Sequence, residues 1–403
     1  MDTSEIEANL KLACEFAIAR KYAGNDPYDG IFSGKLENIR NRWIKYLFIQ
    51  LQVSSPVNFR PFLGIGSGVD IKGLGLFFKA YLTLKRLESS GIKILDSHIL
   101  DREIEWIRTY LMDHSLIASH GLHCWSGHYF NVQGRKGFLS PNQPEIISST
   151  LIGEGMIEYH HLFGDKQSLE VVKGVRDFLA RDLLRNEDGW NYFGYSPGAS
   201  GRIVYNATAL GCKFSRSSGL LLNESSQISI KRMMDLIRHV QNSDGSWNYS
   251  FEPETGRMGK QIDFHQGFIL DSLIDFAAEE KMEGIAPIEG TYQESLLKGA
   301  DFYWNKQFLP DGRSKWRWPR QWPVDSHNQA QGIITFSKLK KFDPKYLDHA
   351  FTVANWSMRN MMGESGGFYY QKWPFFTNKI EYMRWSQAWM ILALATLLEN
   401  CHE

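Results

Sequence analysis

A repeated pattern with a period of about 60 residues constrains the fold of this 403-residue chain more than any other feature. In each copy, a polar and aromatic-rich stretch leads into a segment that starts with acids, amides or histidines and continues with small and apolar residues. The six copies begin near Asp70, Glu145, Tyr205-Asn206, Asp263, Asp325 and Arg384, at intervals of 57 to 75 residues. Such a period indicates supersecondary units that bury their apolar faces only against one another.

Two kinds of helix are expected to alternate along the chain. Segments with apolar residues at three- and four-residue spacing, separated by charges, predict outer helices with one solvent-exposed face. These segments are 36–53, 98–113, 166–184, 227–242, 291–308 and 344–361. Segments with more Gly, Ala and Ser and fewer charges predict enclosed inner helices at 70–88, 145–163, 203–221, 262–279, 325–339 and 382–399. We therefore expect an all-α fold, an (α/α)6 toroid of six inner and six outer helices.

The lengths of the connections predict a polarity for this barrel. Links from an outer to the next inner helix are long, whereas links from an inner to an outer helix are short, as at Gly164-Asp165. The long loops and the N-termini of the inner helices should therefore meet at one end, and long loops in compact domains are usually functional. A further helix at 5–22 predicts an N-terminal extension, 1–35, packed on a single barrel domain, 36–403.

Charge and cysteine usage exclude several classes of protein. Forty-five basic and 45 acidic residues cancel, so no overall field attracts nucleic acid. The four cysteines are scattered, which favours a reduced, cytoplasmic protein without structural disulfides. The acidic, amphipathic start is unlike a signal peptide, and the longest apolar run, 388–398, is too short to span a membrane.

Aromatic residues gather in the long loops. Seven of the 13 tryptophans lie there, next to Asp-Gly or Gly-Gly turns and polar side chains. Flat rings beside hydrogen-bonding groups suit a sugar, although such rings also pin loops onto a barrel rim. The predicted substrate-binding residues are Trp125, Trp190, Tyr192, Asn206, Trp247, Tyr249, Trp316, Arg317, Trp318, Tyr370, Arg384 and Gln387.

Candidate catalytic groups lie where the inner helices begin. Asp-x-His occurs twice, in neighbouring repeats, and could bring two carboxylates and two imidazoles around one cavity; each Asp alone is typical of a helix cap. Histidine titrates near neutrality and serves as a general acid or base. The candidates are Asp263, His265, Asp325 and His327, together with Glu154, a carboxylate between two glycines, and Tyr205.

Motifs for metals and cofactors are weak. The glycines at 64, 66 and 68 do not follow a predicted strand and lack the spacing of a dinucleotide fingerprint. The stretch Gly121 to His128, GLHCWSGH, holds two His and one Cys without a second pair of ligands at zinc spacing. We therefore expect no metal and no cofactor.

The twelve-helix plan with Asp-x-His at inner-helix starts resembles the six-hairpin carbohydrate-active superfamily, which includes glycoside hydrolases, polysaccharide lyases and sugar epimerases. The phrases IDFHQGFILDSLIDF and KWRWPRQWPVDSHNQAQGIITF look like proteins of bacterial surface-polysaccharide gene clusters. The segment Gln241 to Trp247, QNSDGSW, also resembles a repeat of terpene cyclases, which are α/α toroids too. The acid and metal motifs of the cyclases are missing from the sequence.

The resemblance implies a sugar-directed enzyme of polysaccharide biosynthesis or modification. One chemistry is proton abstraction on a uronate, as in a lyase or epimerase, with His265 and His327 as base and acid, and with Asn206, Arg317 or Arg384 neutralising the uronate. Glycoside hydrolysis by a carboxylate pair, a non-catalytic carbohydrate-binding or assembly protein, and, remotely, a cyclase-like toroid remain alternatives. The expected partner is an oligosaccharide or sugar conjugate, without nucleic acid or an integral membrane segment, and with peripheral association with polysaccharide machinery open.

Overall fold

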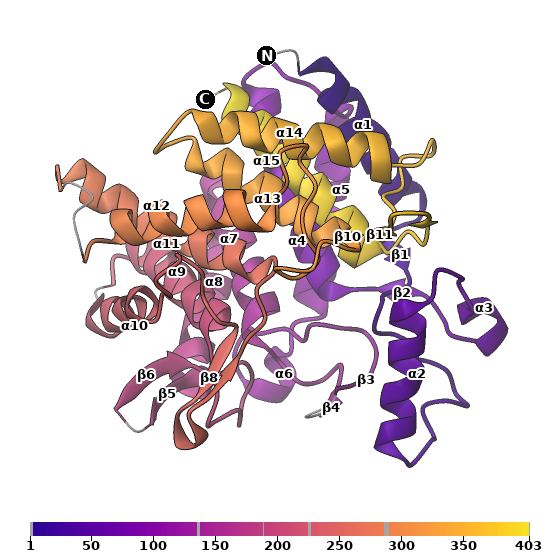
Figure 1. Cartoon of the computed structure of the whole chain (residues 1–403), viewed down its shortest axis with the longest axis horizontal. Helices are drawn as coiled ribbons and strands as arrows, with labels where there is room; N and C mark the ends of the chain where they lie inside the picture. Colours follow the sequence, from indigo (N-terminus) through magenta and orange to yellow (C-terminus); the bar gives the residue numbers. More distant parts are fainter. Residues whose placement is uncertain (1–2, 135–137, 188, 225–226, 286–289, 403) are drawn as a thin grey trace.

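A closed ring of six helices forms the centre of the molecule. The computed structural model describes residues 3–134, 138–187, 189–224, 227–285 and 290–402. The inner helices are α4 (Ile71–Ser89), α7 (Ile146–Phe163), α9 (Tyr205–Leu222), α11 (His265–Met282), α13 (Ser326–Leu339) and α15 (Trp389–His402), the last preceded by the π-helical turn η4 (Met383–Ala388). Each inner helix packs against the next, and α15 packs against α4, so the ring is closed (Figure 1).

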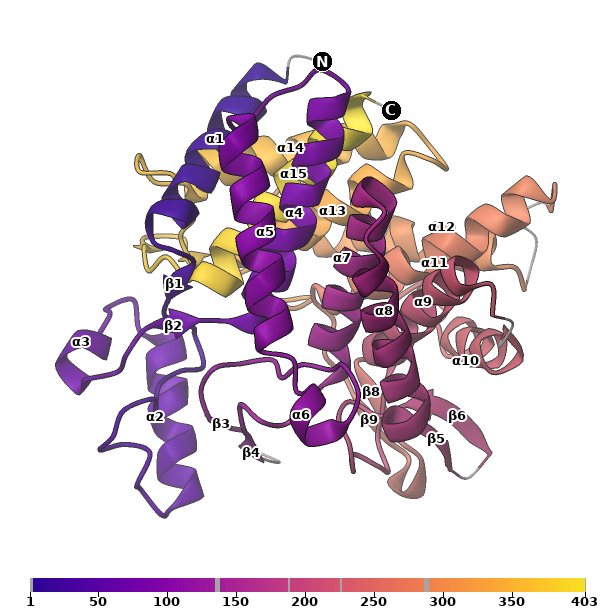
Figure 2. The ribbon, with the colours of Figure 1, turned by 180° about the vertical axis from the view of Figure 1, so that it is seen from behind.

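An outer layer of helices surrounds this ring. The outer helices are α5 (Ser97–Asp113), α8 (Lys166–Phe178), α10 (Gln227–His239), α12 (Tyr292–Phe302) and α14 (Lys345–Met361), and each packs against the inner helix that precedes it in the chain (Figure 2). Short π-helical turns extend two of them, η1 (Leu179–Leu183) and η3 (Tyr303–Gln307). The expected (α/α)6 toroid is confirmed.

The sixth outer position is held by the first helix of the chain, which was expected as an N-terminal extension. Helix α1 (Ser4–Ala19) packs on α15 and η4, beside α14 in the ring order. The helix expected at 36–53 forms as α2 (Arg42–Ser54), but it stands away from the barrel and packs near β3 (Val132–Gln133). We propose that α1 belongs to the barrel; the division into 1–35 and 36–403 stays a prediction.

Short strands occur only in the loops of the described chain, which agrees with the all-α class. The remaining strands are β1 (Ala23–Gly24), β2 (Gly68–Val69), β4 (Phe138–Leu139), β5 (Leu184–Glu187), β6 (Trp190–Phe193), β7 (Ile203–Val204), β8 (Ser250–Glu252), β9 (Arg257–Gly259), β10 (Val324–Asp325), β11 (Gln371–Lys372) and β12 (Thr377–Asn378). All pairings between them are antiparallel, and β7-β8-β9 and β10-β11-β12 form three-stranded sheets. The other short helices are α3 (Arg60–Leu63), α6 (Ile117–His120) and η2 (Pro253–Thr255). No described helix is long and apolar enough to cross a membrane.

Three buried glutamines in the first turns of inner helices hold the long loops in place. The Gln266 amide accepts from the backbone N–H of Trp247 and donates to the carbonyl of the same residue, at 2.7 Å each. Gln329 likewise accepts from the Ser314 N–H and donates to the Gly312 carbonyl. Gln387 repeats the arrangement with Phe368 and Gly366. We call these three residues the glutamine clamps.

Glycines complete the clamped turns. Gly245, Gly312 and Gly366 have φ values of 92°, 93° and 91°, a left-handed conformation that suits glycine. A Cβ at these positions would meet a backbone carbonyl of Lys298 in α12, Thr352 in α14 and Leu12 in α1, respectively. The same turn therefore packs against three successive outer helices, and the contact with Leu12 supports the place of α1 in the ring.

Removal of one clamp should destabilise the fold. Gln329→Ala would leave the Ser314 N–H, the Gly312 carbonyl and the Ser357 hydroxyl without the amide that they contact. We expect a loss of about 2–4 kcal/mol in the free energy of unfolding, measured by urea denaturation. Gln321→Ala, at an exposed loop position, is the matched control and should change the free energy by less than about 0.5 kcal/mol. Equal values for the two variants would contradict the clamp.

Candidate functional site

The first turns of the inner helices meet at the loop end, as the six-fold repeat predicted, and acidic side chains cap several of them. Asp70 accepts a hydrogen bond from the Gly73 N–H, and Glu145 accepts one from the Ser148 N–H. Asp263 accepts from the His265 N–H and Asp325 from the His327 N–H. Asp70, Glu145 and Asp325 are N-caps, and Asp263 comes one residue before the N-cap of α11, so all four side chains are held at the loop end of the ring.

The first candidate pair is His265 with Asp263. His265 Nδ1 lies 2.5 Å from Asp263 Oδ1, and the imidazole retains some solvent exposure while the carboxylate is buried. The ring stacks on Phe264, with centroids 4.2 Å apart, and meets the edge of Tyr249 at 4.7 Å. Burial raises the pKa of Asp263, but the His265 imidazole and its hydrogen bonds outweigh burial and leave that pKa below its usual value.

A second pair of the same kind is His128 with Asp70. His128 Nδ1 lies 3.2 Å from Asp70 Oδ2, and the imidazole is again partly exposed. Burial raises the pKa of Asp70, but His128 and Arg384 together hold it below its usual value. The motif GLHCWSGH marks His128 only as a weak zinc ligand and gives no sign of its pairing with Asp70. The six-fold pattern carried no signal for the pair because His128 lies in a loop 58 residues away.

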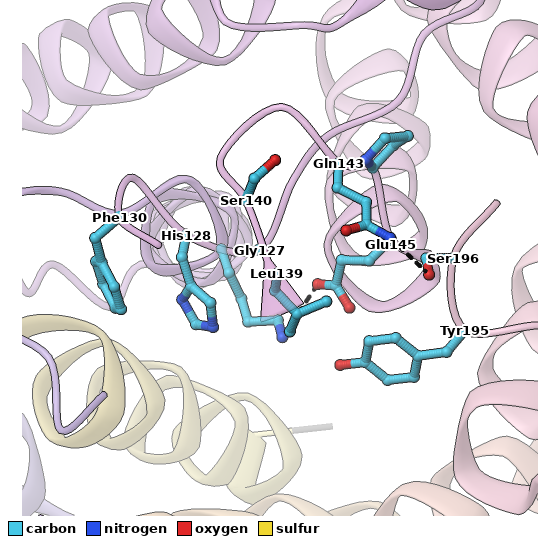
Figure 3. A pocket seen from close by; sticks show the side chains of 11 residues that line it. Gly127, His128, Phe130, Leu139, Ser140, Gln143, Glu145, Tyr195 and Ser196 are labelled. Atoms are coloured by element: carbon cyan, nitrogen blue, oxygen red, sulfur yellow. Dashed lines mark hydrogen bonds and ion pairs between the residues drawn. The ribbon is translucent and has the colours of Figure 1, made fainter. Parts of the chain in front are cut away.

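His128 also lines a small pocket between the starts of α4 and α7, with a volume of about 30 Å³. Figure 3 shows the side chains of His128, Glu145 and Tyr195 pointing toward the same space. Glu145 Oε1 lies 3.2 Å from Lys72 Nζ. Burial raises the pKa of Glu145, but Lys72 and the hydrogen bonds from Ser148 and Tyr195 together outweigh burial, so the net pKa is lowered and the carboxylate stays charged.

His327 is buried rather than open to solvent. Its ring lies between Phe264 and Trp389, with centroid distances of 4.0 and 4.4 Å, and neither ring nitrogen has a hydrogen-bond partner among the described residues. Burial, together with the positive charge of Arg384, lowers the pKa of His327 well below 6.5. The imidazole is therefore neutral at physiological pH.

Asp325, the N-cap of α13 two residues before His327, accepts three hydrogen bonds. They come from the His327 N–H, the Trp385 indole N–H and the Gln371 amide, at 2.9 to 3.0 Å. Burial nevertheless raises the pKa of Asp325 to about 6. Its oxygens are occupied by protein donors, which favours a positioning role for this side chain.

Arg384 is buried in an ion-pair network rather than directed at a ligand. Its Nη2 lies 2.6 Å from Asp26 Oδ2, and its Nε lies 3.6 Å from Asp70 Oδ2. Ligand atoms of Asp26, Asp70 and His128 lie within 4.8 Å of one another, a spacing that could hold a metal ion. Arg384 already supplies the positive charge there, so the cluster fits an arginine-centred network better than a metal centre.

The predicted aromatic binding residues divide into two groups. Trp125 and Trp247 are fully buried, and their indoles donate to the carbonyls of Leu111 and Ile237 in outer helices. Also buried are Tyr192, Tyr205, Asn206, Tyr370 and Gln387. The side chains that stay accessible or partly accessible are Trp190, Tyr249, Trp316, Arg317 and Trp318. Interior packing explains the first group, so only the second group remains as candidates to contact a ligand.

Glu154 does not lie with the other candidates. It lies in the middle of α7, 2.5 Å from Lys79 and 3.0 Å from Lys213, and it lines a cavity of about 300 Å³ toward the C-terminal ends of the inner helices. These two lysines outweigh burial and lower the pKa of Glu154. A carboxylate at that end is not positioned to act with His265.

The segment 241–247, which resembles the cyclase repeat, stabilises its own turn and packs into the interior in this chain. The amide of Gln241 donates to the carbonyls of Gly245 and Ser295, and Trp247 fills the interior. The loop end also holds residues that are not among the predicted site residues, namely Asp26, Tyr28, Lys72, His128 and Tyr195. They come from segments outside the repeated Asp-x-His pattern, or, for Lys72, from the unmarked second position of α4.

The pH dependence of stability should reveal the environment of Asp325. Because its folded-state pKa is raised from 3.8 to about 6, the side chain favours folding most below pH 4, and this contribution is lost as pH rises to 6. The stability of Asp325→Asn relative to the wild type should therefore rise by up to about 3 kcal/mol between pH 4 and 7, by denaturant titration. Asp343→Asn, at a site where Lys345 lowers the pKa, should show a constant difference over that range. A constant difference for both variants would contradict the raised pKa.

Comparisons with solved structures identify the fold. An alpha-mannanase of glycoside hydrolase family 76 from Bacteroides thetaiotaomicron matches with a TM-score of 0.63 and 11% identity, covering 83% of this chain and 88% of that one. A cellobiose 2-epimerase from Bacillus thermoamylovorans matches with a TM-score of 0.60 and 12% identity, over 83% and 88%. A possible member of glycoside hydrolase family 105 from Salmonella enterica matches with a TM-score of 0.62 and 10% identity, over 100% and 95%.

No protein-family model and no curated protein sequence matches the chain. At 10–12% identity the structural likeness establishes the fold, and it confirms the resemblance to six-hairpin toroids at that level. The chain is therefore an (α/α)6 toroid of the kind found in carbohydrate-active enzymes.

Proposed function

We propose that this protein is a carbohydrate-active enzyme that moves protons at a sugar carbon, as an epimerase or lyase does. The observation that carries the proposal is the occurrence of two imidazole–carboxylate pairs, His265–Asp263 and His128–Asp70, at the loop end. Solved toroids similar in fold include a cellobiose 2-epimerase, which supports sugar chemistry. A role in polysaccharide biosynthesis stays a prediction.

The two pairs suit acid–base work. In each, the carboxylate contacts Nδ1, so the proton is assigned to that nitrogen and Nε2 is left as the basic nitrogen of the neutral imidazole. A carboxylate in this position also stabilises the imidazolium that forms when Nε2 accepts a proton. One imidazole could remove a proton from a sugar carbon while the other returns one, which gives epimerisation, or protonates a leaving group, which gives elimination.

We assign these roles to His265 and His128 rather than to His265 and His327. His327 is buried between aromatic rings and its pKa is well below 6.5, because of burial first and Arg384 second. An imidazole that resists protonation is a poor base. We propose instead that neutral His327 and Asp325 hold the helix starts at the loop end in place around the substrate.

For an acidic sugar, Arg317 is the candidate partner for the carboxylate. Its guanidinium is exposed, and its Nε lies 3.7 Å from Asp263 Oδ2, beside the first imidazole pair. Arg384, the other arginine expected in this role, is buried against Asp26. Arg317 could therefore neutralise a uronate next to His265, and the partly exposed Trp316 and Trp318 could pack on the sugar ring.

Glycoside hydrolysis is the second candidate, and one observation favours it. A pKa of about 6, raised by burial, is suitable for a general acid, and Asp325 has this value. Against it, all three donors around Asp325 come from the protein, and Asp263 and Asp70 are both occupied by histidines. Hydrolysis would require one of these carboxylates to exchange its partner for the glycosidic oxygen.

Isotope exchange can separate these chemistries. The protein would be incubated in heavy water with cellobiose, a mannan oligosaccharide and a uronate-containing oligosaccharide. We expect deuterium at a sugar carbon, seen by mass spectrometry and NMR, or a new unsaturated chromophore. His265→Asn and His128→Asn should each lower the rate by at least about 10²-fold, because each removes one proton-transfer group.

Two controls make this test specific. His98→Ala, on the exposed face of α5, and Glu154→Gln, at the opposite end, should leave the rate within about 2-fold of the wild type. Near-UV circular dichroism of each variant separates loss of chemistry from loss of fold. New reducing ends without deuterium at carbon would support hydrolysis, and saturable binding without turnover would support a non-catalytic carbohydrate-binding protein.

A further inference from the structure

Helix α2 presents an apolar stripe to solvent instead of burying it. Trp43, Leu47 and Leu51 recur at four-residue spacing and are 51%, 56% and 58% exposed, and Ile44 lies beside them. The opposite face packs inward through Ile49 and Gln52, which are buried. An exposed apolar face of this size marks an interaction site more often than a chance feature of a surface.

Neighbouring loops enlarge this surface. Phe62 in α3 is 86% exposed, and Phe375 between β11 and β12 is 98% exposed. The Asn378 amide donates to the carbonyl of Ser55 at 3.0 Å, which ties the β11–β12 hairpin to the segment that follows α2. We call Trp43, Ile44, Leu47, Leu51, Phe62 and Phe375 the rim patch.

The two chain segments that carry the rim patch are basic. Residues 38–69, which contain α2 and α3, include no Asp or Glu, and neither do residues 365–380, which contain the β11–β12 hairpin. Basic side chains flank the apolar ones in both segments, although the whole chain is neutral. Those with solvent exposure are Arg40, Arg42, Lys45, Lys372 and Lys379.

The rim patch projects from the barrel, and this position suits a partner with a broad, deformable surface. Figures 1 and 2 show α2 and α3 projecting from the barrel on the side away from the two chain ends. Aromatic and aliphatic side chains on a projecting helix, with arginine and lysine beside them, are the features of helices that lie in the interface of an anionic membrane.

We propose that the rim patch is a docking surface for an anionic lipid bilayer. The apolar side chains enter the headgroup region, and the basic ones contact lipid phosphates. Leu139 of β4 lies on the wall of the His128 pocket, and β3, its paired strand, packs near α2, so docking would bring this pocket close to the headgroups. The inference concerns a surface outside the proposed active site and does not require the proposed chemistry.

Vesicle co-sedimentation tests the proposal directly. The full chain would be mixed with vesicles of phosphatidylcholine alone or with 30% phosphatidylglycerol. We expect at least 10-fold stronger binding to the anionic vesicles, reduced by added salt. Leu47→Glu/Leu51→Glu and, separately, Arg42→Glu/Lys45→Glu should each lower that binding at least 10-fold, because one removes apolar insertion and the other reverses the charge.

Matched changes elsewhere control for general surface effects. Met282→Glu and Leu220→Glu replace exposed apolar residues near the C-terminal ends of inner helices, and both variants should bind vesicles as the wild type does. Absence of binding to both vesicle types would overturn the proposal. So would a dimer, seen by light scattering, that Leu47→Glu/Leu51→Glu dissociates, because the patch would then be an interface between two copies of the chain.

Discussion

The structure of the loop end depends on the buried glutamine clamps. A side-chain amide offers one acceptor and two donors, so a single Gln in the first turn of an inner helix can satisfy both an N–H and a carbonyl of an overlying loop. Gln266, Gln329 and Gln387 do this in three consecutive repeats. Because buried backbone groups without partners are costly, the clamped turns have one low-energy position. The aromatic and charged residues that follow each turn are placed accordingly.

Much of this arrangement was accessible from the sequence. The period, and the contrast between helices with one solvent-exposed face and enclosed helices, predicted the ring. The loop lengths predicted that Asp263 and His265 would lie at the same end as Asp325 and His327. The sequence does not predict which tryptophans are buried and which are exposed. Trp247 and Trp316 follow similar Asp-Gly turns, yet the first is fully buried and the second is partly exposed. The difference depends on whether the indole reaches an outer-helix carbonyl, as Trp247 does at Ile237, and local sequence does not encode that distance.

The N-terminal region shows a second limit of pattern analysis. Periodicity reveals that a helix has an apolar stripe, but not which surface covers it. The stripes of α1 and α2 predicted two similar amphipathic helices; α1 covers α15, whereas α2 turns Leu47 and Leu51 outward. The His128–Asp70 pair was missed for a related reason, because contacts between a loop and a distant helix cap leave no periodic trace. Contacts that cross between repeats have to be observed rather than inferred.

The ion pair between Asp26 and Arg384 joins residues 358 positions apart in the chain. Helices α1 and α15 pack against each other, so the last inner helix contacts the helix that begins the chain. During synthesis on a ribosome, the earlier repeats can stack as an open arc long before that meeting. Asp70, and through it His128, acquires its arginine neighbour only when the arc closes. Closure of the barrel and assembly of this half of the candidate site therefore depend on the same contact between the two ends of the chain.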